Sequence, residues 1–161
     1  MSGNTQASTF HVSTDALPER DRLAFWREQF GRNVARYDFE PLESSRIYGR
    51  VTARATPGFQ LISIDHSAMR VLRTPELLTD GNDDLVLQIT MTGNICAQLG
   101  REIKVDPGDA VLCSNADAGT FVSPSADSRC KLLTLSRRNL RPMLRDFDTA
   151  MCARSRRHRR R

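Results

Sequence analysis

After the first part of the chain, the spacing of apolar residues changes from a helical to a strand-like period. Leu23, Trp26 and Phe30 lie on one helical face, so residues 13–33 are predicted to form an amphipathic helix. Gly31 is a candidate for its C-terminal stop, because glycine readily adopts the backbone conformation that ends helices. This helix is expected to precede a β-rich region.

The region after this helix shows apolar and polar residues in alternation, which is typical of half-buried strands. Turn signals such as Thr92-Gly93-Asn94 separate the alternating segments. Short strands at near-regular spacing predict an antiparallel sandwich or barrel. The predicted strands span residues 46–55, 59–66, 68–73, 85–91, 94–100, 101–106, 110–115, 119–123 and 130–135.

One turn in this series has distinctive chemistry. Pro107-Gly108-Asp109 interrupts two apolar segments, which predicts strand, tight turn and strand, as in a hairpin. Residues 136–148 return to a helix-like composition, so a second helix is expected to follow the strands.

The length of 161 residues fits one domain. No apolar run approaches the ~20 residues that span a bilayer, and residues 1–10 lack the features of a secretory signal. A cytoplasmic protein without membrane contact is therefore expected. Residues 1–9 are polar and are expected to be disordered.

The net charge of +5 comes from the end of the chain. Residues 153–161 contain six arginines and no acid, and the remainder carries 18 basic and 19 acidic residues. Such a run can bind nucleic acid nonspecifically by releasing counterions from phosphates. The candidate contacts are Arg156, Arg157, Arg159 and Arg160. An arginine-rich ending can also arise from a shifted reading frame, and that alternative stays open.

The residues that bind metals or attack substrates show no catalytic spacing. The histidines lie in three separate regions without a His-x-His pair, and no G-x-S-x-G motif is present. Three cysteines lie in or beside apolar segments without a C-x-x-C pair, so we expect buried small side chains: Cys96, Cys113 and Cys130. We therefore expect no metal, no cofactor and no enzymatic activity.

Four segments together resemble a known family. Residues 10–32, 73–93, 98–115 and 133–144 are similar, in order and spacing, to the N-terminal sensor domain of AraC-type transcription regulators. The resemblance implies a mainly β fold, a cupin-like antiparallel β-barrel of the jelly-roll type with an N-terminal and a C-terminal helix. It also implies a small-molecule effector or dimerisation as the function.

The resemblance divides the chain into a sensor domain over residues 10–150 and an Arg-rich tail over residues 151–161. The family's C-terminal helix-turn-helix domain has no counterpart, so we expect a truncated regulator or an isolated domain without sequence-specific DNA binding. Two alternatives stay open: a nucleic-acid-binding protein acting through its arginine tail, and a degenerate cupin enzyme. Salt-sensitive DNA binding would favour the first and bound metal the second.

Candidate effector ligands come from predicted strands and their ends: Arg73, His66, Gln88 and Thr90. A guanidinium can bind a carboxylate through two bonds, but Arg73 could also be an ordinary surface arginine or pair with Asp83 or Asp84. Gln88 and Thr90 share a strand face with Val86, opposite the leucine-rich face. If the leucine-rich face fills the core, Gln88 points away from any cavity.

The predicted C-terminal helix carries an apolar stripe of Leu140, Leu144 and Phe147, at i, i+4 and i+7. The stripe must be buried against its own barrel or against a second copy of the chain. Pairing of two copies through this helix would make a homodimer.

Overall fold

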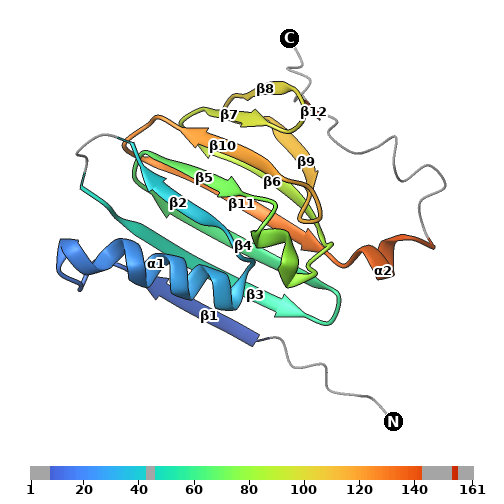
Figure 1. Ribbon diagram of the computed structural model, residues 1–161, viewed down its shortest axis with the longest axis horizontal. Helices are drawn as coiled ribbons and strands as arrows, with labels where there is room; N and C mark the ends of the chain where they lie inside the picture. Colours follow the sequence, from blue (N-terminus) through green and yellow to red (C-terminus); the bar gives the residue numbers. More distant parts are fainter. Residues whose placement is uncertain (1–7, 43–45, 143–153, 156–161) are drawn as a thin grey trace.

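The computed structural model describes residues 8–42, 46–142 and 154–155, and in this part the chain forms two antiparallel sheets (Figure 1). The larger sheet has the strand order β1-β3-β4-β11-β6-β9-β12 and the smaller β2-β5-β10-β7-β8. The strands of the larger sheet are β1 (Ser8–Ser13), β3 (Gly49–Thr56), β4 (Phe59–His66), β11 (Ser128–Leu135), β6 (Leu85–Thr92), β9 (Ala110–Ser114) and β12 (Arg154–Ser155). Those of the smaller sheet are β2 (Asp38–Pro41), β5 (Met69–Arg73), β10 (Gly119–Ser123), β7 (Ile95–Gln98) and β8 (Glu102–Val105).

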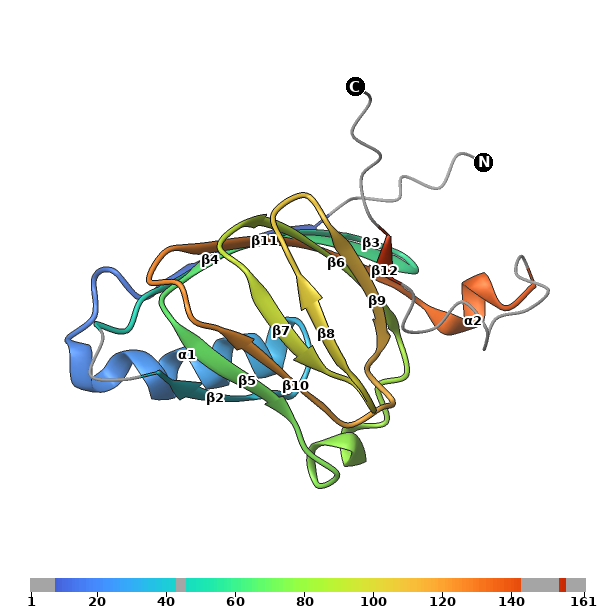
Figure 2. The same ribbon diagram turned by 90° about the horizontal axis from the view of Figure 1, so that it is seen from above.

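The two sheets face each other across one apolar interior, and Figure 2 shows helix α1 (Glu19–Asn33) beside β2, in the layer of the smaller sheet. The predicted mainly β, antiparallel, cupin-like architecture is confirmed. The helices after α1 are short: the 3-10 helix η1 (Leu77–Asp80) and α2 (Arg137–Leu140). No helix in the described residues has the length and apolarity needed to cross a membrane.

Helix α1 buries the side chains predicted to face the core. Trp26 and Phe30 are buried and Leu23 packs against the same cluster. Gly31 does not end the helix, which continues for two more residues to Asn33. The prediction of a stop at Gly31 was wrong, because the Phe30 carbonyl accepts a hydrogen bond from Val34 N and closes one further turn.

Two strands lie where none was predicted. β1 begins at Ser8, within the segment expected to be disordered, and pairs with β3 from Ser8–Ala55 to Ser13–Arg50. β2 is a four-residue strand paired with β5. Both lie at an edge of their sheet and have a mixed composition, so their backbone pairing identifies them more clearly than their apolar pattern does.

The Pro107-Gly108 turn connects the two sheets and does not form a hairpin. β8, before the turn, pairs with β7, whereas β9, after it, pairs with β6. Gly108 has φ +89°, and Asp109 N donates to Asp106 O at 2.9 Å, which is the geometry of a type II turn. The local prediction of a tight turn is right and the predicted pairing is wrong, because two strands joined by a tight turn can still enter different sheets.

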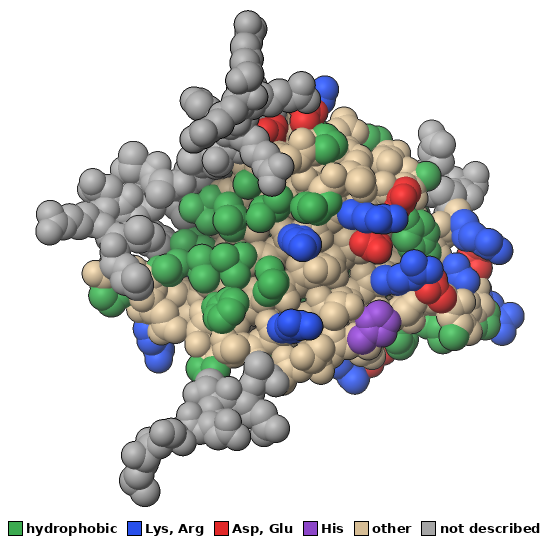
Figure 3. Space-filling model, turned by 180° about the vertical axis from the view of Figure 1, so that it is seen from behind, with side chains coloured by type: hydrophobic (Ala, Val, Ile, Leu, Met, Phe, Trp, Pro, Cys, Tyr) green, Lys and Arg blue, Asp and Glu red, His purple; other side chains and the backbone are tan. Residues whose placement is uncertain are grey.

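Strand β6 directs its more polar face into the barrel. Val86 and Thr90 are buried there, whereas Met91 on the opposite face is 47% exposed. On the outer face, Leu87 lies in register with Leu133 and Leu112, and Leu133 with Leu61. Figure 3 shows hydrophobic side chains gathered on this side of the molecule. Gln88 therefore points inward, contrary to what a leucine-filled core would require.

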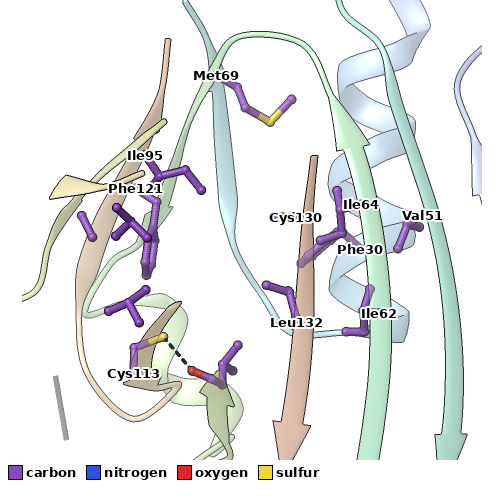
Figure 4. Close-up of a cluster of buried hydrophobic side chains, with 14 of the residues drawn as sticks. Phe30, Val51, Ile62, Ile64, Met69, Ile95, Cys113, Phe121, Cys130 and Leu132 are labelled. Atoms are coloured by element: carbon purple, nitrogen blue, oxygen red, sulfur yellow. Dashed lines mark hydrogen bonds between the residues drawn. The ribbon is translucent and has the colours of Figure 1, made fainter. Parts of the chain in front are cut away.

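The core lies between the sheets and combines side chains from both. Figure 4 shows Ile62 and Ile64 of β4 on one side of the interior and Ile95 and Phe121 of the smaller sheet on the other. Each fully buried side chain of this size contributes about 1.5–3 kcal/mol. Of the three cysteines predicted to be buried, two are so and Cys96 is half-buried.

Candidate ligand-binding site

An aromatic cluster forms one wall of the barrel interior. Trp26 and Phe30 come from α1, Phe39 from β2, and Tyr37 from the connection between them. The Phe30 ring lies edge-on to Phe39 at 5.2 Å and to Tyr37 at 6.0 Å between centroids. Such tilted pairs stabilise the wall beyond the burial of their area. The remaining wall consists of strand side chains from both sheets.

A cavity of about 60 Å³ lies within these walls. It has roughly the room of two water molecules. Its lining is mostly apolar, with polar side chains from β4, β6, β10 and β11: His66, Gln88, Ser123 and Thr134. This mixture of an apolar surface and a few polar groups is typical of small-molecule sites.

Several polar atoms around the cavity lack hydrogen-bond partners. In the described part of the chain, Trp26 Nε1 and Thr134 Oγ1 are buried without one. Among the described residues, His66 bonds through Nδ1, at 2.8 Å from Ser67 O. A carbonyl can only accept, so Nδ1 carries the proton and Nε2 is the acceptor nitrogen of the ring. A buried polar group without a partner costs about 1–3 kcal/mol. These atoms are therefore available to a bound molecule.

The cavity is electrically neutral. Burial lowers the pKa of His66, so its imidazole is uncharged at neutral pH. Burial raises the pKa of the Cys130 thiol to about 12 and also raises the pKa of Tyr37. No charged side chain lines the cavity within residues 8–142 that the structure describes.

Arg73 lies behind the aromatic wall, and the protein itself occupies its guanidinium. Nη1 and Nη2 donate to the two carboxylate oxygens of Asp80 at 2.8 and 2.7 Å. Further bonds reach the carbonyls of Asn115, Arg36 and Leu77. Its side chain is only 2% exposed. Arg73 thus holds η1 and the connection after α1 against the barrel.

The structure divides the four predicted effector ligands into two pairs. His66 and Gln88 line the cavity, and Gln88 forms no side-chain hydrogen bond to the described residues. Arg73 and Thr90 do not line it: Arg73 is bound as above, to Asp80 rather than Asp83 or Asp84, and Thr90 is buried beside the Pro107-Gly108 turn. Whether His66 or Gln88 binds an effector stays a prediction.

The residues that sequence reasoning missed are Tyr37, Asn115, Ser123 and Thr134, together with Trp26 as a cavity wall. Tyr37 donates from its hydroxyl to Asn115 Oδ1 at 2.6 Å, which ties the cavity wall to the Arg73 network. None of these residues belongs to a motif. Inward positions on β10 and β11 become visible only with the register of the strands, although Trp26 and Phe30 could be placed inward from their helical spacing.

The remaining predicted sites lie largely outside the described residues. Leu140 ends α2, whereas Leu144, Phe147 and the four tail arginines are beyond it. Pairing and nucleic-acid contact through them stay predictions. A larger, open groove of about 1110 Å³ beside α2 is lined in part by charged residues such as Asp83 and Arg137. Among the described residues, no three His, Cys, Asp or Glu side chains come together as a metal site.

Comparison with known proteins shows a family for this chain and a similar fold among solved structures. A family model described as "AraC-binding-like domain" matches residues 26–160. The crystal structure of CuxR, an AraC-like transcriptional activator, superposes with a TM-score of 0.75 at 14% identity, covering 91% of this chain and 54% of CuxR. The chain thus spans about half the length of that protein. No curated protein matches the sequence.

Weaker likenesses extend to other proteins. KdgF from Halomonas matches with a TM-score of 0.43 at 17% identity over 66% of this chain and 91% of its own. A cupin superfamily protein from Desulfitobacterium hafniense matches with 0.42 at 13% identity over 60% and 83%.

Proposed function

We propose that this chain, which belongs to the AraC-binding-like domain family, is the small-molecule-binding domain of a transcription regulator of the AraC type. The observation that carries this proposal is the interior cavity with unpartnered polar groups from both α1 and the strands. A cavity of this kind suits reversible binding, because it offers hydrogen bonds and apolar contact without a catalytic group. We therefore propose binding without chemistry, in the cytoplasm.

The experiment is a thermal-shift screen of a metabolite library against the wild type and two variants. Ser123→Leu fills the cavity from β10, where Ser123 is buried, and Lys131→Ala alters the exposed face of β11. An effector raises the melting temperature of the wild type and of Lys131→Ala but not of Ser123→Leu, because ligand stabilises only the state that binds it. The effector must also be recovered unchanged. No stabilising compound, or equal stabilisation of Ser123→Leu, would contradict the proposal.

We also propose that two copies pair through the segment that contains Leu140, Leu144 and Phe147. The apolar stripe supports this, since two self-complementary copies would bury it. Sedimentation should show a dimer for the wild type and a monomer for Leu144→Asp. The arginine tails of two copies repel each other, so added salt should strengthen the dimer. A wild type that stays monomeric at all salt concentrations would end this proposal.

A further inference from the structure

We infer that the cavity takes an uncharged, largely apolar molecule that carries both a hydrogen-bond acceptor and a hydrogen-bond donor. This inference rests on the proposed function, because it names the class of effector that the same cavity would sense. Three features carry it: the absence of a charged side chain among the described residues that line the cavity, the unpartnered hydrogen-bonding groups of those residues, and the wall through which it can widen.

The first feature excludes ions. Of the cavity-lining groups that can titrate, His66 has a lowered pKa, and Tyr37 and Cys130 have raised ones, so these three are in their neutral forms. Arg73, whose guanidinium lies 5.5 Å from the ring centroid of the cavity-lining Tyr37, already binds Asp80 and three carbonyls, so it cannot neutralise a bound anion without breaking that network. Taking an ion out of water costs several kcal/mol unless a partner of opposite charge receives it. An anionic or cationic ligand therefore gains nothing here that offsets this cost.

The second feature sets the polar groups of the ligand. Trp26 Nε1 is a donor only, and it has no acceptor within the described residues, so a ligand must supply an acceptor. His66 Nε2 is an acceptor, since Nδ1 holds the proton, so a ligand must supply a donor. The hydroxyls of Thr134 and Ser123 and the amide of Gln88 can meet either kind of group. Alcohols, phenols and primary amides have both groups on a neutral frame.

The third feature concerns room. A cavity of about 60 Å³ is smaller than a six-membered ring requires, so a wall must move. Helix α1 supplies Trp26 and Phe30 but belongs to neither sheet. Besides its buried aromatic side chains, it is held by side-chain bonds from Arg22 to Ile47 O and from Arg27 to Phe39 O, by the Arg27–Asp38 ion pair, and by the bond from Gln60 to Asn33 O. An outward shift of α1 widens the cavity while both sheets stay paired.

This arrangement gives a direct reporter, because Trp26 is the single tryptophan of the chain. The fluorescence emission of Trp26 is measured while the protein is titrated with five one-ring probes of similar size: benzamide, benzyl alcohol, toluene, benzoate and benzylamine. Benzamide and benzyl alcohol should bind at least tenfold more tightly than benzoate and benzylamine. Toluene, which has no hydrogen-bonding group, should bind several-fold more weakly than benzamide.

Two variants locate the binding. Thr134→Val removes a hydroxyl that has no partner while keeping the volume, so the fold is retained and the affinity for benzamide should fall about two- to tenfold. Lys131→Ala, on the outer face of the same strand, should leave the affinity unchanged. A similar loss in both variants would place the probes elsewhere and overturn the inference.

The outcomes separate this inference from the sensor proposal. Charged probes that bind as tightly as neutral ones, with the same change in Trp26 emission, would overturn the ligand class and leave the sensor proposal standing. If Trp26 responds to none of the five probes and the library screen finds a charged effector, the ligand class is likewise overturned and the sensor proposal stands. If Trp26 responds to no probe and the library yields no ligand, both the ligand class and the sensor proposal are overturned.

Discussion

Arg73 is the residue on which the polar contacts at one end of the barrel converge. Its guanidinium joins a carboxylate, three backbone carbonyls and, at 5.5 Å, the ring of Tyr37. A planar fork with five donors fits this set of acceptors, and the ammonium group of lysine does not. Arg73→Lys should therefore lower the free energy of unfolding by about 3 kcal/mol, measured by urea denaturation. A loss below about 1 kcal/mol would show that the network is dispensable.

Asp80 makes the same network sensitive to acid. Hydrogen bonds from Arg73 are the main reason that the pKa of Asp80 is lowered to about 2 from an ordinary value of 3.8. Because the folded value is the lower one, the stabilisation is fully present above about pH 4 and is lost as the pH falls towards 2. The wild type should lose on the order of 2 kcal/mol over this window through Asp80. Asp80→Asn should be less stable at pH 7 and should lack this part of the acid dependence, whereas Asp83→Asn, at an exposed position, should keep it.

His66 adds a second pH dependence in a milder range. Burial lowers its pKa below 6.5, so the unfolded chain takes up the proton first as the pH falls. Stability should therefore be constant above about pH 7 and decrease as the pH drops through 6.5 and below. His66→Asn keeps a side-chain donor for Ser67 O and cannot titrate. Urea midpoints at pH 7.5 and 5.5 should differ less for this variant than for the wild type, and an equal difference would contradict the argument.

At the scale of the elements, the fit between α1 and β3 depends on a missing side chain. A Cβ built at Gly49 would lie 2.7 Å from ring carbons of Trp26, so the indole packs on bare backbone. Gly49→Ala should displace Trp26, shift its emission and destabilise the fold by about 1–3 kcal/mol. Gly31→Ala is the matched control, because nothing lies within 4 Å of its Cβ position and alanine favours the helix. It should stabilise by about 0.5–1 kcal/mol, and a normal Trp26 emission in Gly49→Ala would refute the packing argument.

The alternation of apolar and polar residues predicts the central strands well, because each strand has one face towards solvent and one face towards the core. It fails at β6, where Leu85, Leu87 and Ile89 make the outer face more apolar than the inner, so the pattern points to the wrong side as the interior. It also fails to assign β8 and β9 to different sheets, since a local turn carries no information on distant pairing. The cavity lining likewise depends on how distant strands pair. Ser123 and Thr134 look like ordinary strand residues in the sequence, and only the strand register brings them to the same cavity. His66 and Gln88 were predicted as polar groups within strands. For Arg73, the alternative of an ion pair with Asp83 or Asp84 was wrong, because its partner is Asp80 in η1.

At the scale of the whole molecule, the basic charge is concentrated at the end of the sequence and is not spread over the rest of the chain. The six arginines of residues 153–161 account for the basic charge, and the remaining 18 basic and 19 acidic residues nearly cancel. We expect nonspecific binding to duplex DNA, with a log–log salt slope of up to about −5 if all six arginines contact phosphates. Deletion of residues 153–161 should abolish it in gel-shift titrations, and replacement of the arginines by lysine should preserve most of it. A footprint at one defined DNA site at physiological salt would contradict this expectation.

The position of β11 in the larger sheet has a consequence for how the chain is made. β11 is the last of the long strands in sequence, yet it lies between β4 and β6 in the middle of the sheet. While a ribosome is still translating residues before Ser128, β4 and β6 each keep one edge open, and both edges carry apolar side chains. Such unpaired edges are where nascent chains associate wrongly. The barrel can close only after Leu135 has left the exit tunnel. Until then, only slow collision with other chains, or the binding of chaperones, keeps the open edges of β4 and β6 from pairing wrongly.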